Sequence, residues 1–190
     1  MILYLASRSP RRRELLDQIK QPYDCLDIDI NEDWDGEETA ADYVARLALE
    51  KARAGYRQVG SDPAHFVLGA DTSVVLDDQI LGKAETEQQA MQMLQTLSGR
   101  MHTVYTGVAL VGKTANVRIN CNRVSFRPLT VEECLHYCRS GEPIGKAGGY
   151  AVQGEAAKFI ERIEGSYSGV MGLPLYETAE LIRLAKLPDE

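Results

Sequence analysis

The chain has 190 residues, 44% of them hydrophobic, and carries a formal net charge of −7. This length can bury one compact α/β domain or two closely packed lobes, so we expect a single folding unit over residues 1–190. The acidic balance argues against a nucleic-acid binder, whose affinity depends on many lysine and arginine contacts to phosphates. The first residues form no basic leader, and no apolar run approaches the roughly 18 residues of a membrane span. We therefore expect a cytoplasmic protein without a membrane partner.

The four cysteines, at positions 25, 121, 134 and 138, show no CxxC spacing. A chain of this size does not need disulfides to fold, so reduced and mostly buried thiols are the favoured interpretation. Cys134 and Cys138 are one helical turn apart and could share a metal. No second Cys/His pair at zinc-ligand spacing accompanies them, so we favour the thiol interpretation.

Strand and helix patterns alternate along the chain. Residues 2–6 have the pattern of a short buried strand, and Ser9-Pro10 then supplies an N-cap and a first-turn proline for a helix to about residue 19. A second helix begins at Thr39. The remaining elements are expected at 66–69 and 73–76 (strand), 80–81 (strand), 86–97 (helix), 104–111 and 117–126 (hairpin), 130–141 (helix), after the glycine-rich 145–154 (short strands), and from Pro174 to about 186 (helix). A strand-rich middle flanked by helices predicts a mixed sheet covered on its faces.

Three consecutive arginines, at 11–13, crowd the first turn of the helix that follows Ser9. The positive end of the helix dipole disfavours each cation there by roughly 0.3–1 kcal/mol, so an anion is expected to offset them. Free backbone N–H groups, the hydroxyls of Ser7 and Ser9 and the guanidinium groups together predict a phosphate-binding cradle. Alternatively, one or two of the arginines are merely solvated. We expect only some of the three to touch a ligand.

Three lysines offer further positive charge. Lys51 follows Leu47 by four residues on an otherwise apolar helical face, where it either reaches to the edge of the core or points into a cleft, and the pattern alone favours the edge of the core. Lys83 and Lys146 each follow a glycine that permits close approach of another group, although either could be a solvated turn residue. Polyphosphate chemistry depends on positioning and charge neutralisation, which dispersed cations can supply.

Asp71 stands in an otherwise apolar strand, between Gly69-Ala70 and Thr72. Aspartate is depleted in strands and rarely buried without a partner. A structural aspartate bonded to backbone amides explains this pattern as well as a catalytic one does. An acidic stretch between the first two helices contains Asp27, Asp29, Glu32 and Asp33. If one of these converges with Asp71, the pair could hold a Mg²⁺ that bridges phosphate oxygens.

Residues 107–114 match the P-loop pattern G-x-x-x-x-G-K-[ST]. A P-loop requires a loop between a strand and a helix, whereas this segment is strand-like and the residues after it alternate as another strand. We therefore interpret Gly112–Thr114 as a hairpin turn. The histidines, at 65, 102 and 136, lack a recognisable nucleophile setting and are interpreted as structural or exposed.

Taken together, several separated motifs resemble the Maf-like nucleotide pyrophosphatases over nearly the whole chain. The matching segments are Leu5–Arg12, Arg46–Ala52, Gly69–Thr72, Leu97–Arg100 with His102, Tyr105–Gly107, Gly141–Pro143, Lys146–Gly148 with Tyr150, Gln153–Gly154 and Gly172–Leu175. Their common order makes the signal specific.

The resemblance implies a two-lobed α/β fold of the inosine-triphosphate-pyrophosphatase type, with a mixed, curved central sheet flanked by helices, a central cleft and usually a homodimer. It also implies that water, assisted by a divalent metal (Mg²⁺ or Mn²⁺), attacks the α-phosphate of a nucleoside triphosphate and releases pyrophosphate. Asp71 matches the family's proton acceptor. The positions that match its phosphate and metal handling are Ser9, Arg12, Glu32, Lys51, Lys83 and Lys146, with Ser7 in the same opening loop and the metal at Glu32 and Asp71.

Arg11, Thr72 and Gln153 match the family positions associated with base selection, and these residue types are those of the branch similar to the dTTP/UTP pyrophosphatases. A glutamine amide can both donate to and accept from a uracil or thymine edge. Ala84 departs from the usual proline, and Gly145 and Gly149 replace more usual residues around Lys146, so we expect a more mobile loop there. The alternative function is a nucleotide-binding regulator of cell division with little turnover.

Overall fold

The structure is a computed structural model that describes residues 1–34 and 36–186. In chain order its elements are β1 (Ile2–Ala6), α1 (Pro10–Gln18), β2 (Asp24–Leu26), α2 (Ala40–Val59), β3 (His65–Leu76), β4 (Gln79–Leu81), α3 (Glu87–Leu97), β5 (Met101–Val111), β6 (Ala115–Phe126), α4 (Val131–Arg139), the 3₁₀ helix η1 (Glu155–Phe159), β7 (Ile160–Glu164), α5 (Tyr167–Met171) and α6 (Leu175–Ala185). None of the described helices combines the length and the apolar composition that crossing a bilayer requires.

The strands form a mixed sheet with the order β2-β1-β3-β5-β6-β7, and β4 pairs with β3 beside this path. β1 is parallel to both β2 and β3, whereas the β3–β4 and β6–β7 pairs are antiparallel. Parallel neighbours need a crossover segment between them, and α2 supplies it between β1 and β3. The predicted mixed sheet flanked by helices is confirmed.

The chain divides into two compact units, and it passes between them within β3, β5 and β6. The first unit comprises Met1–Asp71, Thr106–Asn120 and Gly172–Glu190, and the second comprises Thr72–Tyr105 and Cys121–Met171. The expected single folding unit and the expected central cleft stay predictions.

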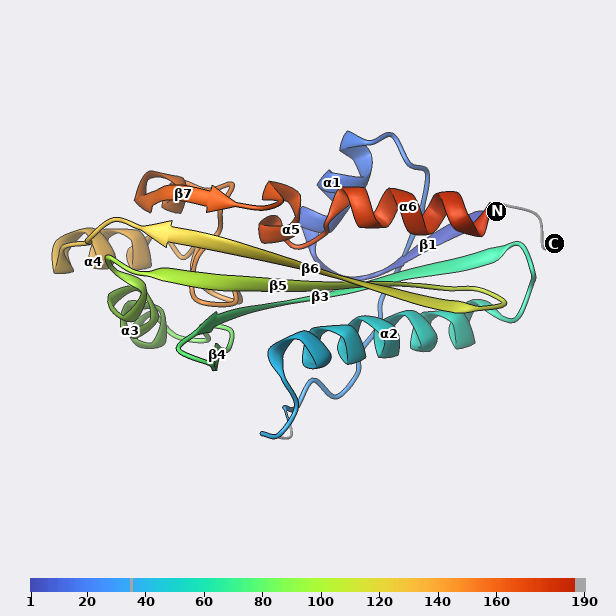
Figure 1. Ribbon diagram of the computed structural model, residues 1–190, viewed down its shortest axis with the longest axis horizontal. Helices are drawn as coiled ribbons and strands as arrows, with labels where there is room; N and C mark the ends of the chain where they lie inside the picture. The colour runs from blue at the N-terminus through green and yellow to red at the C-terminus, as the bar shows by residue number, and fades with distance from the viewer. Residues whose placement is uncertain (35, 187–190) are drawn as a thin grey trace. The chain divides into compact units, whose positions relative to one another are not determined.

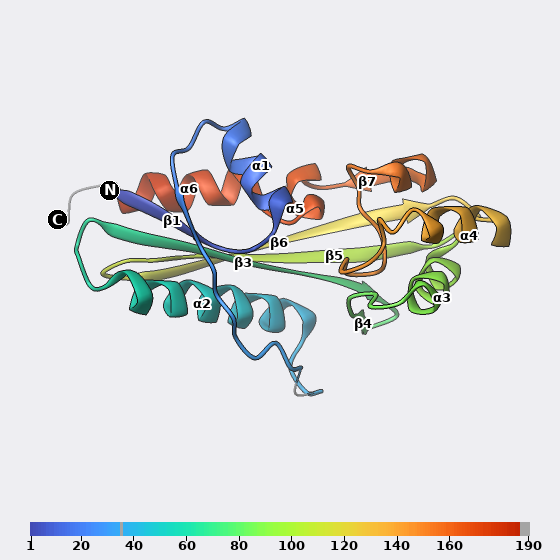
Figure 2. The ribbon, with the colours of Figure 1, turned by 180° about the vertical axis from the view of Figure 1, so that it is seen from behind.

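In the first unit, α2 lies on one face of the strands, whereas α1 and α6 lie on the other (Figures 1 and 2). Each of these helices buries apolar side chains. The fully or nearly fully buried side chains are Leu15 and Leu16 of α1, Val44, Leu47 and Ala48 of α2, and Leu181 and Ile182 of α6. This sandwich fixes both α1 and α2 relative to β1 and the first half of β3.

In the second unit, α3 packs against α4, and both helices begin with the predicted capping boxes, at Thr86/Gln89 and Thr130/Glu133. The same unit contains a cluster of aromatic rings in edge-to-face contacts, to which α4 contributes Tyr137. Its members are His102, Phe126, Tyr137, Tyr150 and Phe159. Such contacts favour one packing arrangement, because ring edges and faces carry opposite partial charges.

The structure confirms the hairpin interpretation of the segment that matches a P-loop pattern. Gly112–Thr114 forms the turn between β5 and β6, and the Gly112 N–H donates to the Thr114 carbonyl at 2.9 Å. No helix follows it, as the described residues continue directly into β6. Three elements were not anticipated: β2, η1 and α5. Each spans only 3 to 5 residues, too few for a hydrophobic period to show.

The four cysteines are free, but their burial differs from the expectation. Cys134 and Cys138 are buried on α4, whereas Cys25 and Cys121 are exposed. The prediction of mostly buried thiols is therefore wrong for two of the four. Cys25 lies on β2 and Cys121 on β6, where side chains alternate between the two faces of a strand.

Candidate active site

A buried ammonium group between two carboxylates forms the centre of the candidate site in the first unit. The Lys51 Nζ donates to Asp71 Oδ1 at 2.7 Å and lies 2.6 Å from Glu32 Oε1. Lys51 and Asp71 are only 8% and 6% exposed, so both are removed from bulk water. Burying charge is costly unless it is paired, and this pairing meets that requirement. Lys51 therefore points inward to the two acids instead of reaching to the edge of the core.

Two glycines allow α2 to approach the sheet closely enough for this contact. A Cβ on Gly69 would lie 2.2 Å from the Ala48 carbonyl oxygen, and one on Gly107 would lie 2.4 Å from the Val44 carbonyl oxygen. Any side chain at either position would push the helix away. With glycine there, Lys51 lies within hydrogen-bond distance of Asp71 two residues beyond Gly69.

The loop that carries Glu32 is held against α2 by two side chains. The Tyr43 hydroxyl donates to the Glu32 carbonyl at 2.6 Å, and Arg46 Nη2 donates to the Asp33 carbonyl at 3.1 Å. Arg46 also forms an ion pair with Glu38 and stacks over the Tyr43 ring, with its Cζ 5.5 Å from the ring centroid. Burial, with smaller contributions from Asp71 and Glu32, raises the pKa of Tyr43 to about 12. The hydroxyl is therefore protonated at neutral pH and remains a donor.

These two positioning residues were missed in the sequence. The spacing of Tyr43 indicated only a core position on α2, and Arg46 was noted only as part of a family motif. A signal was present in the acidic stretch itself, because a loop with several carboxylates needs cationic or hydrogen-bonding partners to be held close to a helix.

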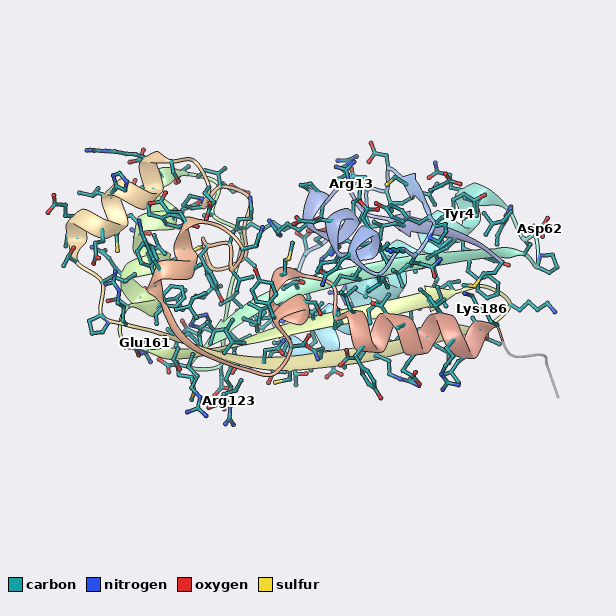
Figure 3. All side chains as sticks on the ribbon, turned by 90° about the horizontal axis from the view of Figure 1, so that it is seen from above. Tyr4, Arg13, Asp62, Arg123, Glu161 and Lys186 are labelled. Carbon is teal, nitrogen blue, oxygen red and sulfur yellow. The ribbon has the colours of Figure 1, made fainter. Side chains whose placement is uncertain are left out.

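The three arginines at the start of α1 differ in exposure, since Arg11 and Arg12 are half-buried and Arg13 is exposed, and contact of only some of them with a ligand stays a prediction. Arg12 Nε donates to the Gly172 carbonyl at 2.8 Å and its Nη1 to the Ser7 hydroxyl at 3.2 Å. Burial lowers the pKa of Arg12, and the carboxylate of Asp71 acts in the opposite direction. Arg13 instead is exposed on α1 (Figure 3). Arg12 therefore lies close enough to Asp71 and Glu32 for their charges to act on its guanidinium group.

The first turn of α1 keeps its positive character. Ser9 is the N-cap and Pro10 opens the helix, but the Ser9 side chain makes no cap hydrogen bond and the first turn contains no acidic residue. Ser7 is buried, and its hydroxyl accepts from the Ser9 N–H at 3.2 Å. Arg11 is half-exposed. Of the residues of the predicted cradle, Ser7 and Ser9 precede α1 and Arg11 and Arg12 lie in its first turn, whose free backbone N–H groups point out of the helix end.

In the second unit, backbone hydrogen bonds join the segments that carry Lys83 and Lys146. Ala84 N–H donates to the Lys146 carbonyl at 3.2 Å, Gly145 N–H to the Ala84 carbonyl at 2.8 Å, and Gly148 N–H to the Gly82 carbonyl at 3.1 Å. The alanine therefore provides a donor that a proline would lack. Lys83 is exposed, whereas Lys146 is half-buried and its Nζ lies 3.3 Å from the Ile144 carbonyl.

The remaining two predicted residues also lie in the second unit. Thr72 directly follows Asp71 on β3 and is half-exposed. Gln153 is exposed on the turn between Tyr150 and η1. Side chains at such accessible positions can meet a ligand without first breaking a packed core.

The carboxylates of the first unit provide some, but not all, of the ligands that a hard divalent cation needs. Among residues 1–34 and 36–186, no cluster of three or more His, Cys, Asp or Glu side chains could hold a metal ion. Glu32 and Asp71 provide two oxygen ligands around Lys51. Mg²⁺ is characteristically held by one or two carboxylates together with waters and substrate phosphates. The donor set therefore fits a cation that binds together with a phosphorylated ligand.

Comparison with known proteins finds relatives that match nearly the whole chain. A family model described as "Maf-like protein" matches residues 2–185. A dTTP/UTP pyrophosphatase of Alkalilimnicola ehrlichii is 52% identical, over 95% of this chain and 91% of the relative. One of Aromatoleum aromaticum is 50% identical, over 95% of this chain and 93% of the relative. Among solved structures, the Staphylococcus aureus Ham1 protein matches with a TM-score of 0.47 and 13% identity, over 66% of this chain and 72% of that chain. On the family model and the relatives half identical to it, the chain belongs to the Maf-like protein family.

Proposed function

We propose that this chain hydrolyses nucleoside triphosphates, dTTP and UTP in particular, to the nucleoside monophosphate and pyrophosphate. Relatives that are 52% and 50% identical over 95% of the chain carry the name dTTP/UTP pyrophosphatase. The structural observation that carries the proposal is the buried Lys51 between Asp71 and Glu32. A closely held acid–cation group beside a positive helix start suits the attack of water on a phosphate.

Asp71 is the proposed general base. Lys51 bonds Oδ1 and so fixes the orientation of the carboxylate, which leaves Oδ2 to accept the proton of the attacking water. The oxygen of that water forms a bond to the α-phosphorus while the bond from this phosphorus to the bridging oxygen of pyrophosphate breaks. The products are a nucleoside monophosphate and pyrophosphate, and the proton passes to Asp71.

The start of α1 is the proposed phosphate site of the first unit. Arg12, together with the first-turn N–H groups and the hydroxyls of Ser7 and Ser9, would neutralise and orient phosphate oxygens. Glu32 and Asp71 would hold Mg²⁺ or Mn²⁺, which supplies charge neutralisation at the phosphates when bound. The Tyr43 and Arg46 contacts support this role for Glu32, because they fix the loop that carries it.

For the second unit, we propose that Lys83 and Lys146 bind phosphate oxygens. The backbone bridge between their segments supports a common role. Thr72 and Gln153, together with Arg11 of the first unit, are the proposed base-selecting residues. The resemblance to the family supports a homodimer in the cytoplasm, and the net charge of −7 supports a free nucleotide over a nucleic acid as the partner.

A nucleotide panel tests the proposal. The purified protein is incubated with dTTP, UTP, CTP, ATP and a methylated GTP, with Mg²⁺, with Mn²⁺ and with a chelator, and the phosphorus products are identified. We expect pyrophosphate, fastest from dTTP and UTP and abolished by the chelator. Release of orthophosphate would contradict the reaction, and binding of dTTP without turnover would favour a regulatory role.

A further inference from the structure

We propose that Tyr137 and Glu142 form a support for the turn that carries Gln153, and that this support sets the selectivity for the nucleobase. The inference rests on the proposed function, because it extends the role of Gln153 in base selection. Neither residue needs to touch the nucleotide. Both are proposed as positioning residues.

The carboxylate of Glu142 bonds to both sides of this support. Its Oε1 accepts from the Tyr137 hydroxyl at 2.7 Å, and its Oε2 accepts from the backbone N–H of Glu155 at 3.1 Å. Hydrogen bonds that end on a carboxylate are shorter and stronger than those between neutral groups. Glu142 thus fixes the backbone two residues after Gln153.

Tyr137 fixes the backbone on the other side of Gln153. Its hydroxyl accepts from the Ala151 N–H at 3.2 Å while donating to Glu142. The ring is fully buried and packs edge-to-face on Phe159, with centroids 5.4 Å apart. Burial raises the pKa of Tyr137, so the hydroxyl stays protonated and can donate. The turn is therefore anchored to α4 and to the aromatic cluster.

Gly154 shows how closely the carboxylate lies against the turn. A Cβ at this position would lie 2.3 Å from both carboxylate oxygens of Glu142, so only glycine fits without moving Glu142. The Gly154 N–H also donates to the Ala151 carbonyl at 3.1 Å, which closes the turn around residues 152 and 153. The backbone is thus held immediately before and after Gln153.

The side chain of Gln153 itself is exposed, in contrast to its anchored backbone. Its amide can present either a donor or an acceptor. A thymine or uracil edge offers an N–H donor and a carbonyl acceptor, whereas cytosine offers a ring-nitrogen acceptor and an amino donor. Discrimination requires the amide at a fixed position, because the strength of a hydrogen bond falls steeply with misalignment. A loosened turn would let the amide shift to suit either base.

Selectivity is the readout that distinguishes positioning from simple stabilisation. The variants are Glu142→Gln, which places an amide donor against a backbone or hydroxyl donor, and Tyr137→Phe, which removes both hydroxyl contacts. The matched control is Glu161→Gln, because Glu161 is an exposed acid of β7 in the same unit. For each protein, kcat/KM is measured for dTTP and CTP, together with inhibition by inorganic tripolyphosphate and the Tm.

We expect the ratio of kcat/KM for dTTP over that for CTP to fall about tenfold in Glu142→Gln and in Tyr137→Phe, the equivalent of one hydrogen bond. The change should come from KM, and inhibition by tripolyphosphate should stay as in the wild type. Glu161→Gln should keep the wild-type ratio. A lower Tm with an unchanged ratio would overturn the inference, since it would show a structural role alone.

A double-mutant cycle tests whether Glu142 acts through Gln153. In a Gln153→Ala background, Glu142→Gln should leave the ratio unchanged, because the amide that it positions is absent. An equal fall of the ratio in both backgrounds would overturn the inference.

Calorimetric binding of dTMP and CMP gives a readout independent of turnover. If the wild type binds dTMP more tightly than CMP and Glu142→Gln loses this preference, but no pyrophosphate is released from dTTP, the proposed function fails while the positioning role stands. An equal affinity for both overturns the inference.

Discussion

The two units of this chain place their functional residues in opposite ways. In the first unit, the groups assigned to the reaction are charged and buried: Lys51 and Asp71 are 8% and 6% exposed. In the second unit, the buried polar groups are neutral, as in the His102–Tyr150 pair. Of the residues proposed to bind the substrate there, Lys83 and Gln153 are exposed, and Thr72 and Lys146 are half-buried.

This difference follows from what each group has to do. A base and its partners need fixed geometry and few competing waters, and a packed helix on a sheet provides both. Residues that select among ligands must reach a variable group, so they stand on turns whose backbone is fixed by contacts behind them, as the Glu142 carboxylate does for residue 155. Substitutions at the buried charges should therefore have larger effects than substitutions at the neutral contacts.

The largest effect on stability is expected from Lys51→Met. This substitution leaves the Asp71 and Glu32 carboxylates close together without the ammonium group between them. We expect a loss of about 3–5 kcal/mol in the free energy of unfolding. Turnover of dTTP should fall by about a hundredfold or more, because a positive charge at the reacting group is removed. Urea denaturation and steady-state kinetics measure the two effects.

The control for Lys51→Met is the same substitution in an Asp71→Asn background. With one carboxylate neutralised, the missing ammonium should cost clearly less stability than in the wild type, while activity stays low. Equal losses of stability in both backgrounds would show that Lys51 and Asp71 are not energetically coupled.

The second prediction concerns pH and the second unit. His102 lies in the aromatic cluster with its Nε2 2.8 Å from the Tyr150 hydroxyl, and burial lowers the pKa of His102 to about 4. Between pH 6.5 and about 4 the unfolded chain binds this proton and the folded chain does not. Stability therefore falls by about 3 kcal/mol as the pH drops through this range, and it is unaffected by His102 above it.

The His102→Gln variant isolates this contribution, because the carboxylates of the chain also titrate in acid. We expect the difference in unfolding free energy between the wild type and the variant to shrink by about 3 kcal/mol from pH 7 to pH 4. A difference that is constant with pH would mean that His102 can be protonated in the folded protein.

The smallest effect is expected from Tyr43→Phe, which removes the 2.6 Å hydrogen bond to the Glu32 carbonyl. We expect a loss of about 1 kcal/mol in stability. The Mg²⁺ concentration needed for half-maximal activity should rise several-fold. Tyr56→Phe is the matched control, since Tyr56 lies half-buried on the same helix. If Tyr43→Phe needs the same Mg²⁺ concentration as the wild type, Tyr43 does not position Glu32 for metal binding.

Much of the fold could be predicted from local chemistry. The capping residues Thr39, Thr86 and Thr130 mark the starts of α2, α3 and α4, and the alternation around the Gly112–Thr114 turn predicts the β5–β6 hairpin. These features depend on neighbours close in the sequence, which is why the sequence shows them. The apolar face of α2 alone favours a Lys51 side chain that reaches to the edge of the core, and the structure corrects this, because Lys51 is directed inward to Asp71.

The features that escaped prediction depend on partners distant in sequence. The Asp71 pattern fits a structural aspartate equally well until α2 brings Lys51 within 2.7 Å of it. The roles of Tyr43 and Glu142 depend on backbone atoms 11 and 13 residues away, and no local pattern marks those contacts. A more mobile loop around Lys146 stays a prediction, although Ala84 N–H and Gly145 N–H join that segment to residues 82–84.

The most direct test of the account is Asp71→Asn, measured for turnover and for binding in the same preparation. The amide keeps the shape of the side chain but cannot take the proton of water, so we expect kcat for pyrophosphate release from dTTP to fall by about a thousandfold. Binding of dTTP, measured by calorimetry without divalent metal, should change by no more than a few-fold, because Arg12 and the start of α1 remain intact. Near-normal turnover in Asp71→Asn would contradict the role of Asp71 as the base.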